Sequence, residues 1–274
     1  MSPNRTGKNK DSGKSKSENS DDERRIPFHF HAEAHAFSAG FIRPTVVPVA
    51  AQAPVSLPSI GGHAHSRVEN FRQNGLVRFT LAESHVSGSW QNNKIVTTHA
   101  TTVIEGLNIL DYILADRIVA RLTSEHHVGE KEGHFIALGT VFEGLRIGGH
   151  EATVTLRHDL MVESETFDDL KKRLAKDEEP EKITVVNDEV ALCSLAENID
   201  LDFPGVSKRG HIIHIKHFGE IAIAELFAAY GTRTLTMLRL NLGSPNSVTG
   251  TVGEATTDGQ PMPPTPGGGS GGSG

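Results

Sequence analysis

Alternating apolar and polar side chains predict short strands along most of the chain. In TLTMLRLNL, at 234–242, the last leucines alternate with polar residues, as expected of a strand that buries one face. Residues 95–104 carry four threonines, and branching at Cβ favours a strand over a helix. Gly148-Gly149 is a dipeptide favoured in hairpin turns. The pattern predicts about ten short strands in a mainly β, antiparallel sandwich or barrel-like domain.

One amphipathic helix is expected near residues 166–178. Phe167, Leu170 and Leu174 fall at i, i+3 and i+7 among charged residues, which is typical of one buried helical face. Thr166 is suited to cap the N-terminus, and Pro180 prevents the helix from continuing.

Residues 107–122 fit either a helix or strands. Leucine or isoleucine recurs there every four residues, as on a helix face, but the flanking segments have the pattern of strands. We favour β structure.

The composition predicts one domain between two tails. Residues 1–26 have almost no apolar side chains and are expected to form a disordered charged tail. Residues 27–242 are expected to form a single β-rich domain, with the prolines of 41–60 marking an edge strand or a surface strap. Residues 243–274 are expected to be flexible and end in a Gly/Ser run that resembles an engineered linker.

Charge and hydropathy argue against several classes of protein. The net charge is −7 and no basic patch stands out, so nucleic-acid binding is not expected. No apolar run is long enough to span a membrane, and no secretory signal peptide is evident at the N-terminus. Cys193 is the only cysteine, which excludes an internal disulfide. Nucleophile-elbow, phosphate-loop and dinucleotide motifs are missing, which favours a non-enzymatic role.

Histidine is the unusual residue of this chain, with 15 copies. In an extended segment His29, His31, Glu33 and His35 share one face because strand side chains alternate. Three imidazoles and a carboxylate are a ligand set suited to Zn, Cu, Ni or Fe.

A second histidine group, at 211–217, offers a reserve metal site. Alternation predicts that His211 and His217 share one strand face, with His214 on the opposite face. The two histidines therefore need further ligands from a neighbouring strand. Protonation of so many imidazoles near pH 6 also makes a pH-dependent assembly conceivable.

Five segments together resemble the choice-of-anchor P family of bacterial proteins. These are PVSLPSIGG (54–62), TTVIEGLNILDYILADRIVARLTS (101–124), GTVFEGLRIGG (139–149), DFPGVSKRGHIIHI (202–215) and TLTMLRLNL (234–242). The resemblance spans most of residues 32–253 and implies a β-rich protein that is extracellular or attached to the cell surface. It implies no catalytic residues.

Two functions stay open from the sequence. The first is a non-catalytic bacterial surface, assembly or interaction module that self-associates as a homo-oligomer through exposed strand edges. The second is a metal-binding protein or metalloenzyme that uses His29, His31 and His35, with His211 and His217 in reserve.

Overall fold

The computed structural model describes residues 28–43, 46–73, 75–130, 132–164, 166–176, 183–243 and 247–261. The tail expected at 1–26 and the Gly/Ser end of the chain lie outside these residues.

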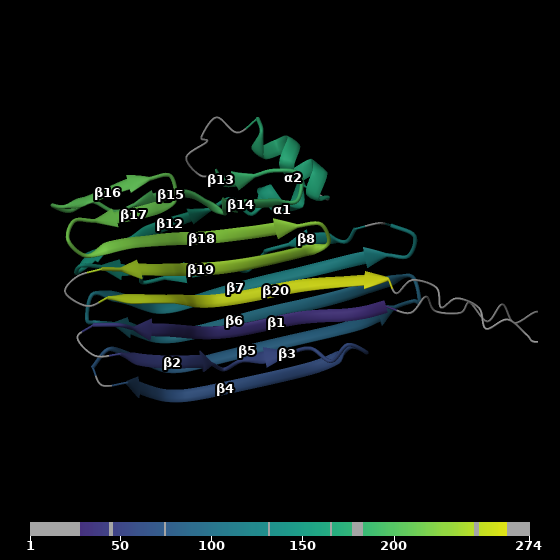
Figure 1. Ribbon diagram of the computed structural model, residues 1–274. Coiled ribbons are helices and arrows are strands. Elements are labelled where there is room, and N and C mark those ends of the chain that lie inside the picture. Colours follow the sequence, from purple (N-terminus) through teal and green to yellow (C-terminus); the bar gives the residue numbers. More distant parts are fainter. Residues whose placement is uncertain are drawn as a thin grey trace, which may run out of the picture.

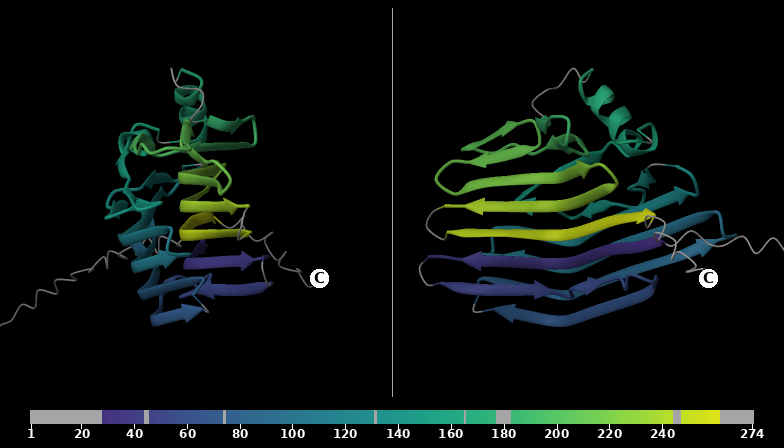
Figure 2. Two further views of the ribbon diagram at one scale, coloured as in Figure 1. Left: turned by 90° about the vertical axis from the view of Figure 1, so that its left-hand side faces the viewer. Right: turned by 45° about the vertical axis from the view of Figure 1, so that its right-hand side comes forward.

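Two antiparallel sheets pack face to face in a sandwich (Figures 1 and 2). The ten-stranded sheet, sheet A, has the order β13-β14-β18-β19-β20-β1-β2, while β17 joins β18 to β16 and β3 pairs with β1. Its strands are β1 (Phe28–Phe41), β2 (Val47–Gln52), β3 (Val55–Ser56), β13 (Ile183–Val186), β14 (Val190–Ser194), β16 (Val206–Arg209), β17 (Ile212–Ile215), β18 (Gly219–Ala229), β19 (Thr232–Leu242) and β20 (Val248–Pro261).

The eight-stranded sheet, sheet B, has the order β11-β10-β7-β6-β5-β4, and β8 and β9 pair with β7. Its strands are β4 (Gly62–Gln73), β5 (Val77–Gln91), β6 (Ile95–Ile109), β7 (Ile113–His127), β8 (His134–Ile136), β9 (Val141–Glu143), β10 (Arg146–Ile147) and β11 (His150–Glu151). A separate ribbon pairs β12 (Thr153–Leu156) with β15 (Ala196–Asp200). The predicted antiparallel sandwich is confirmed, and the sheets do not close into a barrel.

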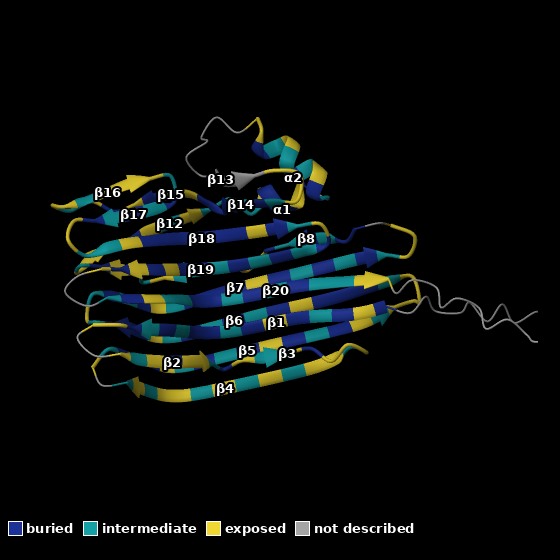
Figure 3. Ribbon diagram, in the orientation of Figure 1, coloured by how far each residue is buried: buried dark blue, intermediate teal, exposed yellow. Residues whose placement is uncertain are grey.

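Buried residues alternate with exposed ones along many strands (Figure 3), and the buried side chains of both sheets form the core between them. Phe37 of β1, Ile104 of β6, Ile118 of β7 and Leu238 of β19 have no exposed surface. The alternation read from the sequence therefore separates an apolar interior from two polar outer faces.

Two short helices, α1 (Asp159–Val162) and α2 (Phe167–Leu174), lie at one edge of the sandwich (Figure 1). The predicted amphipathic helix is confirmed as α2, which buries Phe167, Leu170 and Leu174. Its cap is Thr166, whose Oγ1 accepts a hydrogen bond of 3.2 Å from the backbone N–H of Asp169. The helix ends at Leu174, earlier than expected, and α1 was not expected. No helix of the described residues is long and apolar enough to cross a membrane.

The domain boundary expected at Leu242 is wrong, because β20 is an interior strand of sheet A. It pairs with β19 on one side and with β1 on the other. The strand is rich in threonine and glycine, but Val248, Val252 and Ala255 face the core and are fully buried. Two neighbouring ladders stabilise this segment, whose own sequence is only weakly apolar.

The ambiguous stretch 107–122 is β structure, as favoured. It contains the end of β6, a turn at Leu110 and Asp111 with positive φ, and most of β7. The proline-rich segment forms β2, at the end of sheet A, and the short strand β3, so the expectation of an edge strand is also confirmed.

One pair is missing from several ladders of sheet A, along a line that crosses the sheet. In β1 and β20 the pairs flanking the gap are His35↔Glu254 and Phe37↔Val252, and β19 has the same gap at Met237. Ala36 and Phe37 are consequently both buried. The outward-facing set of β1 therefore passes from His35 directly to Ser38.

Candidate functional site on the outer face of sheet A

The first half of β1 carries the predicted histidines on the outer face of sheet A. Phe28, Phe30, Ala32 and Ala34 are buried in the core, while the alternating residues His29, His31, Glu33 and His35 are exposed or half-buried. The predicted sharing of one face is thus present in the structure.

These histidines do not converge on one point. Residues i and i+2 of a strand lie roughly 6.5 Å apart, whereas a metal ion binds imidazole nitrogens at about 2 Å. Instead, His31 Nδ1 lies 3.9 Å from Asp258 Oδ2, and His35 Nδ1 lies 3.9 Å from Glu254 Oε1. Within the described part of the chain, no group of three or more His, Cys, Asp or Glu side chains is placed to hold a metal ion.

His211 and His217 are not together either. His211 is fully buried, and its Nε2 lies 3.1 Å from Glu225 Oε1. His217 lies in the turn after β17 with φ of 62° and is exposed. The expected shared face is wrong because the strand ends at Ile215.

His211 belongs to a buried structural network around Glu225. Burial acts against the charged form of Glu225, but hydrogen bonds from Arg239 and His211 outweigh it and lower its pKa to about 2. Arg239 donates from Nη2 to Glu225 Oε1 over 2.8 Å. This network fixes β18 to β19 and to the start of β17.

A hydroxyl–imidazole cluster marks the gap in the β1–β20 ladder. His35 Nε2 lies 3.1 Å from Thr251 Oγ1 and 3.3 Å from Ser38 Oγ, and the two hydroxyl oxygens are 3.1 Å apart. Sequence reasoning missed Ser38, because strict alternation would direct its side chain into the core. It also missed Thr251 and Glu254, because they lie in the segment expected to be a tail.

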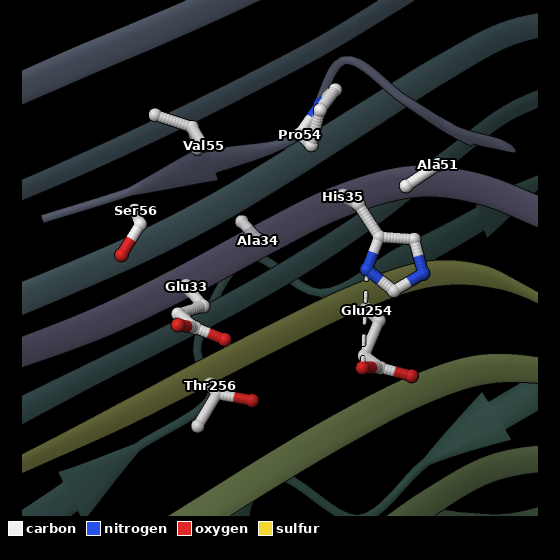
Figure 4. Close-up of a pocket in the computed structure, with 9 residues that line it drawn as sticks. All are labelled: Glu33, Ala34, His35, Ala51, Pro54, Val55, Ser56, Glu254 and Thr256. Carbon is white, nitrogen blue, oxygen red and sulfur yellow. Dashed lines mark ion pairs between the residues drawn. The ribbon is translucent and has the colours of Figure 1, made fainter.

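This cluster lies between two hollows on the outer face. A pocket of about 400 Å³ extends along β1 and β20 beside the strap that carries β3. Figure 4 shows the His35 ring joined to Glu254 by a dashed line, with Pro54 and Val55 on the neighbouring strap. The pocket is lined by Glu33, Ala34, His35, Ala51, Pro54, Val55, Ser56, Glu254 and Thr256. A second hollow of about 530 Å³ includes Ser38 and Thr251. We call the two hollows with the cluster between them the sheet A groove.

The groove is better arranged for binding than for nucleophilic catalysis. A hydroxyl, a histidine and a carboxylate resemble a catalytic triad in composition. However, the 3.9 Å from His35 Nδ1 to Glu254 exceeds a hydrogen bond, and His35 Nε2 is shared by two hydroxyls. Carboxylates, hydroxyls and an imidazole beside Pro54 and Val55 supply hydrogen-bonding groups next to apolar contact.

The chain belongs to the family described as Domain of unknown function (DUF8256), whose model matches residues 28–187. The match includes every strand of sheet B and the β1 side of the groove, and it ends before β14. Searches of curated proteins and of solved structures found no match to this chain.

Proposed function

We propose that this chain is a non-catalytic interaction module of a bacterial surface protein, and that it binds a polar ligand in the sheet A groove. The observation that carries the proposal is the hydroxyl–imidazole cluster of Ser38, His35 and Thr251, with the two hollows beside it. The resemblance to the choice-of-anchor P family supports the surface setting.

The lining of the groove favours a neutral glycan as ligand. Sugar hydroxyls both donate and accept hydrogen bonds, which suits the carboxylates of Glu33 and Glu254 and the hydroxyl of Thr256. Pro54 and Val55 offer apolar contact for the C–H faces of a sugar ring. The two carboxylates would repel an acidic glycan at neutral pH.

The sheet edges support recognition by a face rather than self-association through strands. At the edge of sheet B, β4 carries the exposed charges of Arg67 and Glu69 and has a positive φ at Asn70. At the edge of sheet A, β2 contains Pro48. Charges, irregular backbone and proline are features that protect edges from pairing with another chain.

Glycan titration at pH 7.5 tests the proposal, with calorimetry or ligand-observed NMR on a panel of neutral and acidic oligosaccharides. We expect a neutral glycan to bind, and expect His35→Ala and Glu254→Ala each to weaken its binding about tenfold, the effect of losing one or two hydrogen bonds. The matched control is His99→Ala, an exposed histidine on the outer face of sheet B.

Three results would count against this proposal. One is the absence of binding across the panel, and another is equal weakening by His99→Ala. The third is turnover of ester or glycoside substrates that disappears in Ser38→Ala, because it would show the cluster to be catalytic. Metal analysis of untagged protein tests the histidine metal site, which stays a prediction.

A further inference from the structure

Four histidines from three adjacent strands gather on the outer face of sheet B, on the opposite side of the sandwich from the groove. His65 of β4 is directly opposite His85 of β5, and Ser87 of β5 is opposite both His63 and His99. All four imidazole-bearing residues are exposed. We call His63, His65, His85 and His99 the sheet B histidine patch.

The charges around this patch nearly cancel while its imidazoles are neutral. Arg67 Nη2 lies 2.6 Å from Glu69 Oε1, and Arg67 Nη1 lies 3.4 Å from Glu83 Oε2. The other oxygen of Glu83, Oε1, lies 3.0 Å from His65 Nε2. From β7, Arg121 and Glu125 both act on His99. With these two arginines and three glutamates, the patch has a net charge of −1 while its imidazoles are neutral. Protonation of all four imidazoles would raise the net charge to +3.

The histidines of β1 differ because three carboxylates lie near their three imidazoles. His31 lies 3.4 Å from Glu33 and 3.9 Å from Asp258, and His35 lies 3.9 Å from Glu254. With His29, these three histidines and three carboxylates form a group whose net charge changes from −3 to 0 on protonation. Acid thus neutralises the β1 histidine group, whereas it makes the sheet B histidine patch positive.

We propose that the sheet B histidine patch is an acid-activated binding surface for a linear phosphate polyanion. The charge of +3 is spread over three strands about 4.8 Å apart, which suits an extended chain of negative groups. A polymer fits better than a lipid bilayer, because no large exposed hydrophobic residue of the described chain belongs to β4, β5, β6 or β7.

Electrostatics within the patch supports activation below neutral pH. Partial burial of the imidazole lowers the pKa of His99 from 6.5, and the nearby Arg121 and His85 lower it further, although Glu125 acts in the opposite direction. His99 also lies 2.9 Å from Thr123 Oγ1 through Nδ1. The patch therefore gains its full charge only in acid, and a bound polyanion would favour the protonated form.

Fluorescence anisotropy with labelled inorganic polyphosphate, measured between pH 7.5 and pH 5.0, tests the proposal on the full chain. Affinity should rise at least about tenfold over this range, and the gain should fall steeply with added salt because counterions are released. His63→Gln/His65→Gln/His85→Gln/His99→Gln should remove the gain. The matched control His29→Gln/His31→Gln/His35→Gln should retain it.

A second variant keeps the test decisive if the quadruple variant folds poorly. His65→Arg/His85→Arg makes two of the charges permanent and should bind polyphosphate already at pH 7.5. Affinity independent of pH, or an equal loss in both glutamine variants, would overturn the proposal. So would acid-dependent binding to phosphatidylglycerol vesicles without binding to polyphosphate. Because the groove lies on the other face, glycan binding and polyphosphate binding can fail separately.

Discussion

The carboxylate of Glu132 joins three parts of the molecule that lie far apart in the sequence. Its Oε1 accepts hydrogen bonds from Arg233 Nη2 over 3.1 Å and from the backbone N–H of Gly231 over 3.2 Å. Its Oε2 accepts a hydrogen bond of 2.8 Å from the N–H of Phe167, at the start of α2. Arg233 is only 1% exposed, and its guanidinium carbon lies 4.4 Å from the ring centre of Phe135.

Removing the charge of Glu132 should therefore destabilise the fold strongly. Glu132→Gln leaves the Arg233 cation buried without its counter-ion, and breaking a buried ion pair in this way costs about 3–5 kcal/mol. It also takes a negative charge from the N-terminus of α2. We expect urea unfolding at pH 7.5 to show a free energy of unfolding that is smaller by this amount. The midpoint should fall and the slope should stay unchanged.

The control is a surface pair of similar geometry. Arg146 Nη2 lies 3.0 Å from Asp116 Oδ1, with side chains 45% and 64% exposed. Asp116→Asn should cost less than about 1 kcal/mol, because solvent screens the pair. Glu132→Leu/Arg233→Met, which removes both charges, should recover much of the lost stability. Equal costs for Glu132→Gln and Asp116→Asn would refute the reasoning.

Three further predictions concern pH and backbone strain. The pKa of Glu225 is about 2 in the fold against an ordinary value of 4.5, which adds stability above pH 4.5 that is lost as pH falls towards 2. In thermal melts over that range, the melting temperature of Glu225→Gln should therefore change less with pH than that of the parent. Burial lowers the pKa of His126, so unfolding takes up a proton and stability should fall as pH drops below 6.5; melts of His126→Phe at pH 7.5 and 5.5 should differ less than those of the parent. Ala224 has φ of 49°, so in urea unfolding Ala224→Gly should cost about 1–2 kcal/mol less than Ala228→Gly, a buried alanine of the same strand without positive φ; equal costs would contradict the strain argument.

Local patterns identified much of the fold because they report on one element at a time. Alternation in TLTMLRLNL predicted β19, and the spacing from Phe167 to Leu174 with Thr166 before it predicted α2. Each signal compares a residue with neighbours a few positions away, so it needs no knowledge of the partner strand.

The candidate site was only half predictable for the same reason. Alternation placed His35 and Glu33 on one face of β1. Thr251 and Glu254 join them only because β20 pairs with β1, across more than 200 residues of chain. Ser38 joins because the missing pair at Ala36 shifts the alternation, and such a gap is a property of two strands together.

The sequence by itself determined that apolar and polar residues alternate along most of the chain, that the fold is mainly β with an amphipathic helix, and that histidine is its distinctive side chain. Only the tertiary structure decided which side chains each histidine faces across the strands. His31 and His35 face the acids of β20, whereas His65 faces His85 and also lies 3.0 Å from Glu83 of the same strand. Strand register sets these neighbours, because ladder pairing brings together residues whose separation along the chain carries no local signal.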